Sequence, residues 1–286
     1  MRRTFRAPAK VNLWLRVFRS DPTGYHPLDT LFCAIDLCDR IDIAPADTGI
    51  RLHVLGAALG VPENNLAYRA AREYYHQIGV APSLEITLHK NIPAGAGLGG
   101  GSSDAATVLQ ALQELHENCL PEADVLAIAA RLGSDVPFFL CGSPVAHATG
   151  RGELLTALPP LPQRSVIVLM PPFTISTSDA YAWLDANGQL MAPRTHDISA
   201  RSWHDVEQVA INDFEPVLFQ RYPRLRELRD ALRASGSSIS LVSGSGAALF
   251  GVYADAAQAE AASADFARRF GDVEIFAART LTNETD

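Results

Sequence analysis

The chain has 286 residues, of which 48% are hydrophobic and 20% charged, and its formal net charge is -8. This composition is typical of a globular protein with a full core and excludes an intrinsically disordered chain. The negative charge argues against nucleic acid as a partner, because phosphate backbones require clustered lysine and arginine. The length allows one large domain or two ordinary ones.

The N-terminus and the cysteines both favour an intracellular protein. The first ten residues are basic, but Pro8 interrupts them and no apolar signal core is present. No uninterrupted apolar run approaches the roughly 20 residues that a membrane span needs. The cysteines at 33, 38, 119 and 141 form neither a C-x-x-C pair nor a metal-ligand spacing, so we interpret them as small core residues in a reducing compartment. We therefore expect a cytoplasmic protein with no membrane partner.

The N-terminal half alternates predicted strands with predicted helices. Residues 3–18 predict a strand with an apolar face that includes Val11 and Leu13, and Lys10 and Asn12 lie on the opposite face. A lysine on a strand is usually a solvated edge charge. Further strands are predicted at 30–43, 50–54 and 84–88, and helices at 65–78, 107–115 and 124–132.

A glycine-rich loop, Pro93–Ala106, lies between the predicted strand at 84–88 and the helix at 107–115. Five glycines between residues 95 and 101 leave the backbone without Cβ atoms, so that a ligand can approach the main-chain N–H groups. Ser102, Ser103 and Asp104 are residues typical of helix N-caps. A glycine loop that leads into a helix N-terminus favours anions, and we interpret it as a phosphate-binding loop rather than a flexible linker.

Three common phosphate-binding motifs do not fit this loop. A P-loop needs a Lys-Ser or Lys-Thr pair after its last glycine, and none is present. Gly95, Gly97 and Gly100 satisfy G-x-G-x-x-G, but a dinucleotide fold requires a second parallel strand after the helix, and another helix is predicted there instead. The companion motifs of protein kinases are absent. The loop therefore belongs to another class.

Two shorter segments are candidate sites. Tyr25 and His26 follow a turn at 20–24, although such a pair is more often loop packing. Asp135 lies in a turn after Gly133 and directly before apolar residues. Without further information, the favoured interpretation of Asp135 is a cap of the next turn.

The C-terminal half has its own strand and helix order. We place a domain boundary near residue 161, in the proline-rich segment 159–162. Strands are predicted at 166–170, 239–242, 247–253 and 273–278, and helices at 179–184, 206–220, 225–234 and 256–270, which is the ferredoxin-like order. A second glycine-rich turn, Ser243–Gly246, separates the two middle strands. Two glycine loops in one chain suggest a shared ligand in a cleft between domains.

Three motifs together resemble the GHMP superfamily of small-molecule kinases, which includes galactokinase, homoserine kinase, mevalonate kinase and phosphomevalonate kinase. These motifs are Ala9–Leu15, Pro93–Ala106 and Ser243–Phe250. The resemblance implies an α+β fold of two domains. The N-terminal domain, 1–161, would be a mixed α/β domain resembling ribosomal protein S5 domain 2, and the C-terminal domain, 162–286, would be ferredoxin-like.

The resemblance is strongest to the branch that phosphorylates a cytidine diphosphate conjugate of methylerythritol, in the non-mevalonate isoprenoid pathway. It depends on residues 98–103, Gly24–His26, Gly133–Phe139 and Asn212-Asp213. Pro27 departs from the pattern, because an acidic residue is usual there. The third motif, Ser243–Phe250, carries serine where threonine is common, which is a milder departure.

The resemblance also implies roles for individual residues. Asp135 would accept the proton of the attacking hydroxyl, and Lys10 would neutralise the charge that develops during transfer. Tyr25 and Tyr181 would sandwich the cytosine, and His26 would read its edge. The remaining substrate contacts would come from Asn12 and Thr177. Mg²⁺ would accompany the nucleotide, and we assign no protein residue as a ligand of the ion. ATP would bind along the glycine loop, at Pro93, Ala94, Gly95, Ala96, Gly97, Leu98, Gly99, Gly100, Gly101, Ser102 and Ser103.

Two other interpretations remain open. The chain could be another kinase of the superfamily, of the homoserine or mevalonate type, although Gly24–His26 argues against it. It could also be a catalytically silent sensor on the same fold, although such a protein would have no need to retain Lys10 and Asp135. The expected partners are small molecules, and the expected state is a monomer or a homodimer.

Overall fold

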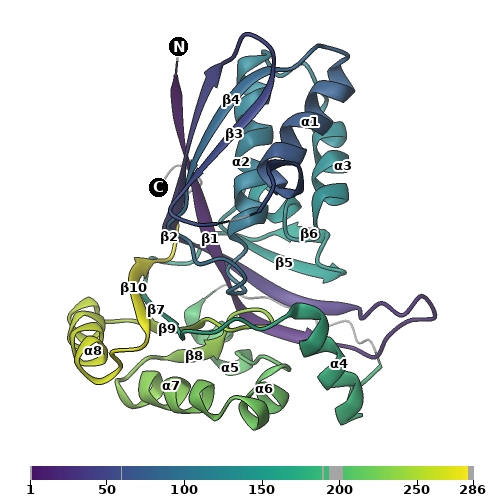
Figure 1. Cartoon of the computed structure of the whole chain (residues 1–286). Coiled ribbons are helices and arrows are strands. Elements are labelled where there is room, and N and C mark those ends of the chain that lie inside the picture. The colour runs from purple at the N-terminus through teal and green to yellow at the C-terminus, as the bar shows by residue number, and fades with distance from the viewer. Residues whose placement is uncertain (1, 59, 189, 193–201, 283–286) are drawn as a thin grey trace. The chain divides into compact units, whose positions relative to one another are not determined.

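The computed structural model describes residues 2–58, 60–188, 190–192 and 202–282. Contacts within the chain divide it into two units. The helices and strands are labelled in Figure 1. This grouping by contact differs from a division along the sequence, and the predicted domains 1–161 and 162–286 stay a prediction. Unit 1 comprises Met1–Ala9, Cys38–Ala94 and Gly99–Gly142, and unit 2 comprises Lys10–Leu37, Gly95–Leu98 and Ser143–Asp286.

Two long strands, β1 (Arg3–Val17) and β2 (Leu28–Pro45), pair with each other. In unit 1, the second half of β2 pairs antiparallel with β4 (Ser83–His89), and β4 pairs parallel with β3 (Gly49–Leu55). Every second side chain of β4 is buried, as the alternating sequence predicted.

Three α-helices complete unit 1 and pack against one another: α1 (Leu66–Ile78), α2 (Gly100–Leu115) and α3 (Glu122–Leu132). The Asn65 side chain accepts a hydrogen bond from the backbone N–H of Ala67 at the start of α1, and Gly79 ends the helix in a left-handed conformation. Small and aliphatic side chains of the three helices form one buried cluster with strands of unit 1. Two short 3-10 helices are also present, η1 (Pro62–Asn64) and η2 (Pro137–Leu140).

In unit 2, the first half of β2 pairs with β5 (Val145–Gly150), which pairs with β6 (Leu154–Ala157). These two strands were not predicted. A separate sheet has the order β10-β7-β9-β8, with every neighbouring pair antiparallel. This arrangement confirms the predicted ferredoxin-like order. Its strands are β7 (Ser165–Met170), β8 (Ile239–Val242), β9 (Leu249–Tyr253) and β10 (Glu274–Arg279).

Among the described residues, five helices accompany that sheet, and four of them, α4, α6, α7 and α8, bury apolar side chains in a second cluster. The leucines at 225, 228 and 232 show the helical spacing of a buried stripe in α7. The helices are α4 (Thr177–Asn187), α5 (Trp203–Val209), α6 (Glu215–Arg221), α7 (Pro223–Ala234) and α8 (Ala256–Arg269).

The single helix predicted at 206–220 is wrong, because the chain forms α5 and α6 with a break between them. The Asn212 side chain accepts a hydrogen bond from the backbone N–H of Phe214 and donates to the carbonyls of Val242 and Gly244. These bonds compete with helical geometry, so the helix cannot continue through this position.

The interpretation of all four cysteines as core residues is also wrong. Cys33 is buried, Cys119 is exposed, and the other two are half-buried. Burial raises the pKa of the Cys33 thiol to about 12. Among the helices that the structure describes, none is long and apolar enough to cross a membrane.

Candidate functional site

The predicted strand–loop–helix context of the first glycine loop is confirmed. The loop follows β4, and α2 begins at Gly100, inside the glycine run. The prediction that Ser102, Ser103 and Asp104 cap this helix is wrong. Gly99 is the N-cap, and no side chain caps the first turn. The main-chain donors at this end of the helix are therefore not satisfied by a cap, as an anion-binding helix terminus requires.

Glycine is required at several positions of this loop. Gly95, Gly97 and Gly99 have φ angles of 65°, 79° and 71°, a conformation that other residues rarely adopt. Alternation of left-handed and ordinary residues turns successive N–H groups toward a common side, as in anion-binding nests. Of the other predicted loop residues, Ala96, Leu98 and Ser103 are buried, Ala94 and Gly101 are exposed, and Pro93, Gly100 and Ser102 are half-buried.

The second glycine loop contacts the first directly. Ser243 Oγ donates to the carbonyl oxygen of Gly97 over 2.9 Å, and the Ala248 N–H donates to the Ala96 carbonyl oxygen over 3.1 Å. A Cβ atom on Gly97 would lie 2.0 Å from the carbonyl oxygen of Ser243. The two glycine loops are therefore in contact, and a ligand shared between them stays a prediction.

A buried ion cluster, which sequence reasoning missed, lies at the base of the first loop. Lys90 Nζ bonds to an oxygen of Asp39 and, at 2.8 Å, to Asp104 Oδ2. The other Asp39 oxygen accepts the backbone N–H groups of Asn91 and Ile92, at 2.6 and 2.9 Å. Lys90 thus joins the residues just before the loop to the helix that follows it.

One lysine can neutralise only one of these two carboxylates. Burial raises the pKa of Asp104 to about 7, and the neighbouring Asp39 adds to this, although Lys90 opposes it. A signal for this cluster was present in the sequence. Lys10 and Lys90 are the only lysines of the chain, whose lysines and arginines together number 24.

Lys10 is not a solvated edge charge, because it is 3% exposed. Its Nζ donates to Asn12 Oδ1 over 2.8 Å and lies 5.1 Å from the centre of the Phe32 ring. The Lys10 backbone N–H donates to the carbonyl of Leu98 over 2.9 Å, which fixes β1 beside the glycine loop. Burial of an ammonium group is costly unless hydrogen bonds compensate it.

Asp135 is half-buried in unit 1, between α3 and η2. The N-cap of η2 is Val136, and Pro137 follows it in the first turn. The two interpretations of Asp135, as a catalytic carboxylate and as a cap of the following turn, both stay predictions.

The predicted cytosine contacts occupy different surroundings within unit 2. Tyr25 is 41% exposed, and the Arg151 guanidinium lies 3.8 Å from the centre of its ring. Tyr181 stacks on His26, with ring centres 5.2 Å apart. Thr177 is exposed at the start of α4, and its hydroxyl lies 3.0 Å from that of Ser245 in the second glycine loop.

Both ring nitrogens of His26 have partners. Nδ1 lies 2.8 Å from the carbonyl oxygen of Phe18, and Nε2 lies 3.1 Å from Asp185 Oδ2. A carbonyl only accepts, so Nδ1 carries a proton. His26 could therefore hydrogen-bond to the edge of a base only if Nε2 gave up its contact with Asp185.

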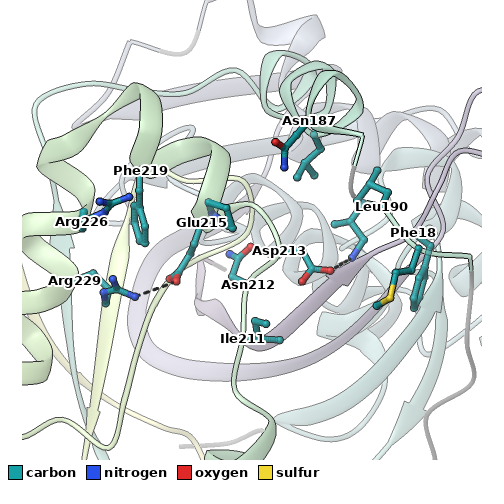
Figure 2. Close-up of a pocket in the computed structure, with 14 residues that line it drawn as sticks. Phe18, Asn187, Leu190, Ile211, Asn212, Asp213, Glu215, Phe219, Arg226 and Arg229 are labelled. Carbon is teal, nitrogen blue, oxygen red and sulfur yellow. Dashed lines mark hydrogen bonds and ion pairs between the residues drawn. The ribbon is translucent and has the colours of Figure 1, made fainter.

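A pocket of about 470 Å³ in unit 2 is lined by none of the predicted site residues. Figure 2 shows the Glu215 carboxylate turned toward Arg229, beside Phe219. Burial raises the pKa of both Asp213 and Glu215. Each nevertheless has a structural task, since Asp213 accepts the Val17 N–H and Glu215 accepts the Val242 N–H, both over 2.9 Å. We assign no catalytic role to this pocket.

No dedicated metal site is found in the part of the chain that the structure describes, because no three or more His, Cys, Asp or Glu side chains there could hold an ion. At the glycine loop, the N-terminus of α2 presents main-chain N–H groups that no side chain caps. Such donors suit phosphate oxygens rather than a cation.

Comparison with known proteins identifies two family regions. The family described as GHMP kinases N terminal domain matches residues 65–143, and GHMP kinases C terminal matches residues 195–272. The first region contains the glycine loop and Asp135, and the second contains Ser243–Gly246.

Individual relatives match most of the chain. The 4-diphosphocytidyl-2-C-methyl-D-erythritol kinase of Citrifermentans bemidjiense is 42% identical over 93% of this chain and 94% of its own length. A crystal structure of 4-(cytidine 5'-diphospho)-2C-methyl-D-erythritol kinase matches with a TM-score of 0.84 and 35% identity, over 97% of this chain and 99% of that chain. Homoserine kinase from Cytophaga hutchinsonii matches with a TM-score of 0.74, over 99% and 95% of the two chains, but at 19% identity it supports the fold alone.

Proposed function

This chain belongs to the family of 4-diphosphocytidyl-2-C-methyl-D-erythritol kinases, within the GHMP kinases, and we propose on that basis that it phosphorylates the 2-hydroxyl group of that substrate with ATP. The reaction belongs to the non-mevalonate route to isoprenoids. The observation that carries the proposal is the first glycine loop. It leads into an uncapped helix terminus and is held at Gly97 by the second loop.

The loop would hold the ATP phosphates through main-chain N–H groups. Gly95, Gly97 and Gly99 supply the backbone conformation that turns these groups toward an anion, and the first turn of α2 adds the positive end of its dipole. Mg²⁺ would accompany the nucleotide and would neutralise phosphate charge there. The protein's own contribution is positioning and electrostatic stabilisation, which dominate in phosphoryl transfer.

We assign the chemistry to Asp135 and Lys10. Asp135 would accept the proton of the attacking hydroxyl as the bond to phosphorus forms. Lys10, desolvated and fixed by Asn12, would stabilise the negative charge that develops on the transferred group. Arginine, with its planar guanidinium, could not replace such a compact ammonium group.

The substrate would be recognised through unit 2. The exposed ring of Tyr25 offers a stacking face for a base, and Tyr181 with His26 offers a second aromatic surface. Asn12 and Thr177 would contact the diphosphate or the diol. The Arg151 guanidinium now on Tyr25 would have to share or leave that ring when a base binds.

A panel of acceptors tests the proposed function. ADP release would be measured with the diphosphocytidyl methylerythritol substrate and, separately, with homoserine, mevalonate and galactose. We expect rapid ADP release with the first acceptor and background rates with the other three. Preference for another acceptor would mean that the chain is a kinase of that acceptor's type. ATP binding without turnover on any acceptor would support the silent sensor.

The place and assembly of the enzyme are part of the same proposal. We expect it to act in the cytoplasm as a monomer or homodimer, on small molecules and not on nucleic acid or membranes. Sedimentation of the purified protein, with and without nucleotide, measures the assembly state directly.

A further inference from the structure

A buried chain of hydrogen bonds begins at Lys10. Lys10 Nζ donates to Asn12 Oδ1 over 2.8 Å, and Asn12 Nδ2 donates to Thr30 Oγ1 over 2.8 Å. The Thr30 hydroxyl then donates to the backbone carbonyl of Trp14 over 2.6 Å. The three side chains are at most 3% exposed, so they exchange these bonds with water only if the strands open.

The two ends of this chain determine its direction. An ammonium group can only donate, so the Asn12 atom facing Lys10 must be the amide oxygen. A backbone carbonyl can only accept, so the single proton of the Thr30 hydroxyl points at Trp14. The lone pairs of Thr30 Oγ1 then face Asn12, and only the NH₂ side of that amide can bond to them. The Asn12 amide consequently has one orientation.

We propose that Thr30 is a positioning residue for phosphoryl transfer. Its hydroxyl holds the Asn12 amide with the oxygen toward Lys10, and this oxygen holds the ammonium group in place. The inference rests on the proposed role of Lys10, since Thr30 itself touches no reacting group. It extends the set of functional residues from β1 to β2, the strand that carries Thr30.

Two substitutions of Thr30 distinguish a positioning role of its hydroxyl from a role in packing alone. Valine has nearly the shape of threonine but leaves Asn12 Nδ2 without its acceptor in a buried site, at a cost that favours rotation of the amide. Serine keeps the hydroxyl but loses a methyl group. A residue needed only for packing would therefore tolerate valine better than serine, and a positioning residue would show the opposite order.

Single-turnover phosphorylation of the proposed substrate measures this order. We expect Thr30→Val to lower the rate by about 10- to 100-fold while the KM for ATP stays nearly unchanged, because small misplacements of a catalytic group have effects of that size. Thr30→Ser should keep the rate within about threefold of the original protein. Equal rates for Thr30→Val and the original protein would overturn the inference.

A double-mutant cycle tests whether Thr30 acts through Asn12. In an Asn12→Ala background the amide is absent, so Thr30→Val should cause no further loss of rate. A full additional loss in that background would show that Thr30 acts by another route and would overturn the proposal.

A measurement that needs no activity completes the test. Because Lys10 and Lys90 are the only lysines, protein labelled at the lysine side-chain nitrogen gives two NMR signals, and Lys90→Arg identifies the Lys90 signal by its loss. Thr30→Val should shift the Lys10 signal and leave that of Lys90 in place. If the original protein fails to phosphorylate the substrate, the proposed function is wrong. The shift of the Lys10 signal still shows whether Thr30 holds Lys10 in place. An unmoved Lys10 signal would overturn the inference in either case.

Discussion

The hydroxyl of Ser243 donates to the main-chain carbonyl of Gly97 over 2.9 Å, and this bond joins the two glycine loops. Gly97 has a φ of +79°, and an added Cβ would lie 2.0 Å from the Ser243 carbonyl oxygen. We expect Gly97→Ala to destabilise the fold by about 2–5 kcal/mol, from left-handed strain and overpacking together. It should also raise the KM for ATP.

Gly49→Ala is the matched control, because Gly49 has a φ of +76° and open space around its Cβ position. It should cost only the strain of about 1–2 kcal/mol. Urea unfolding and ATP kinetics of both variants make the comparison. Equal losses for the two variants would show that the contact between the loops is unimportant.

The second glycine loop depends on Asn212, which donates to the carbonyls of Val242 and Gly244 over 2.8 Å each. Asp at this position would have no donor and would place a carboxylate against two carbonyl oxygens. We expect Asn212→Asp to reduce the free energy of unfolding by on the order of 2–4 kcal/mol. The exposed Asn64→Asp should have almost no effect, and similar melting temperatures for both variants would contradict the anchoring role.

The Lys90 cluster predicts a specific dependence of stability on pH. Folding raises the pKa of Asp104 from 3.8 to about 7, so the native state binds this proton more tightly than the unfolded chain. The contribution of Asp104 to stability is therefore full below pH about 4 and is lost as the pH rises to about 7. The slope is at most about 1.4 kcal/mol per pH unit.

Asp104→Asn removes this titration while Asp39 and Lys90 stay in the chain. As the pH rises from about 4 to about 7, the free energy of unfolding of the original protein should therefore fall relative to that of the variant. Urea unfolding across that range measures it. Parallel pH profiles would mean that Asp104 does not hold a proton in the folded state.

The exposed ring of Tyr25 gives a prediction about the substrate. Tyr25→Ala should weaken binding of the cytidyl substrate by about 1–3 kcal/mol, the usual contribution of one base stacked on an aromatic ring. Tyr25→Phe keeps the ring and should bind nearly normally. Steady-state kinetics with both substrates separates the effects, and an equal rise in the KM for ATP would contradict a role at the cytosine.

Local patterns were enough to predict much of this fold. The alternation at Leu84, Ile86 and Leu88 predicted β4, and the glycine run from residue 95 predicted the loop. The helical spacing of the apolar residues in 107–115 predicted α2, although this helix begins earlier, at Gly100. The ferredoxin-like order followed from the periodicity of the C-terminal half. These features depend on neighbouring residues, which a sequence displays directly.

The errors arose where distant side chains decide the structure. The break at Asn212 depends on carbonyls 30 and 32 residues away. The Lys90 cluster joins Asp39, which is 51 residues away, to Asp104. The burial of Lys10 is likewise a tertiary effect that strand periodicity cannot reveal. The roles of Lys10, Asp135 and the aromatic residues remain predictions.

Transfer of labelled phosphate tests the central claim most directly. ATP carrying radioactive phosphorus at the γ position would be mixed with the purified protein and the diphosphocytidyl methylerythritol substrate, and the products would be separated. The account predicts that the label moves to the substrate, and that Asp135→Asn binds ATP normally but transfers the label at least about 100-fold more slowly. Label recovered only in ATP or inorganic phosphate, or transfer at full rate by Asp135→Asn, would contradict it.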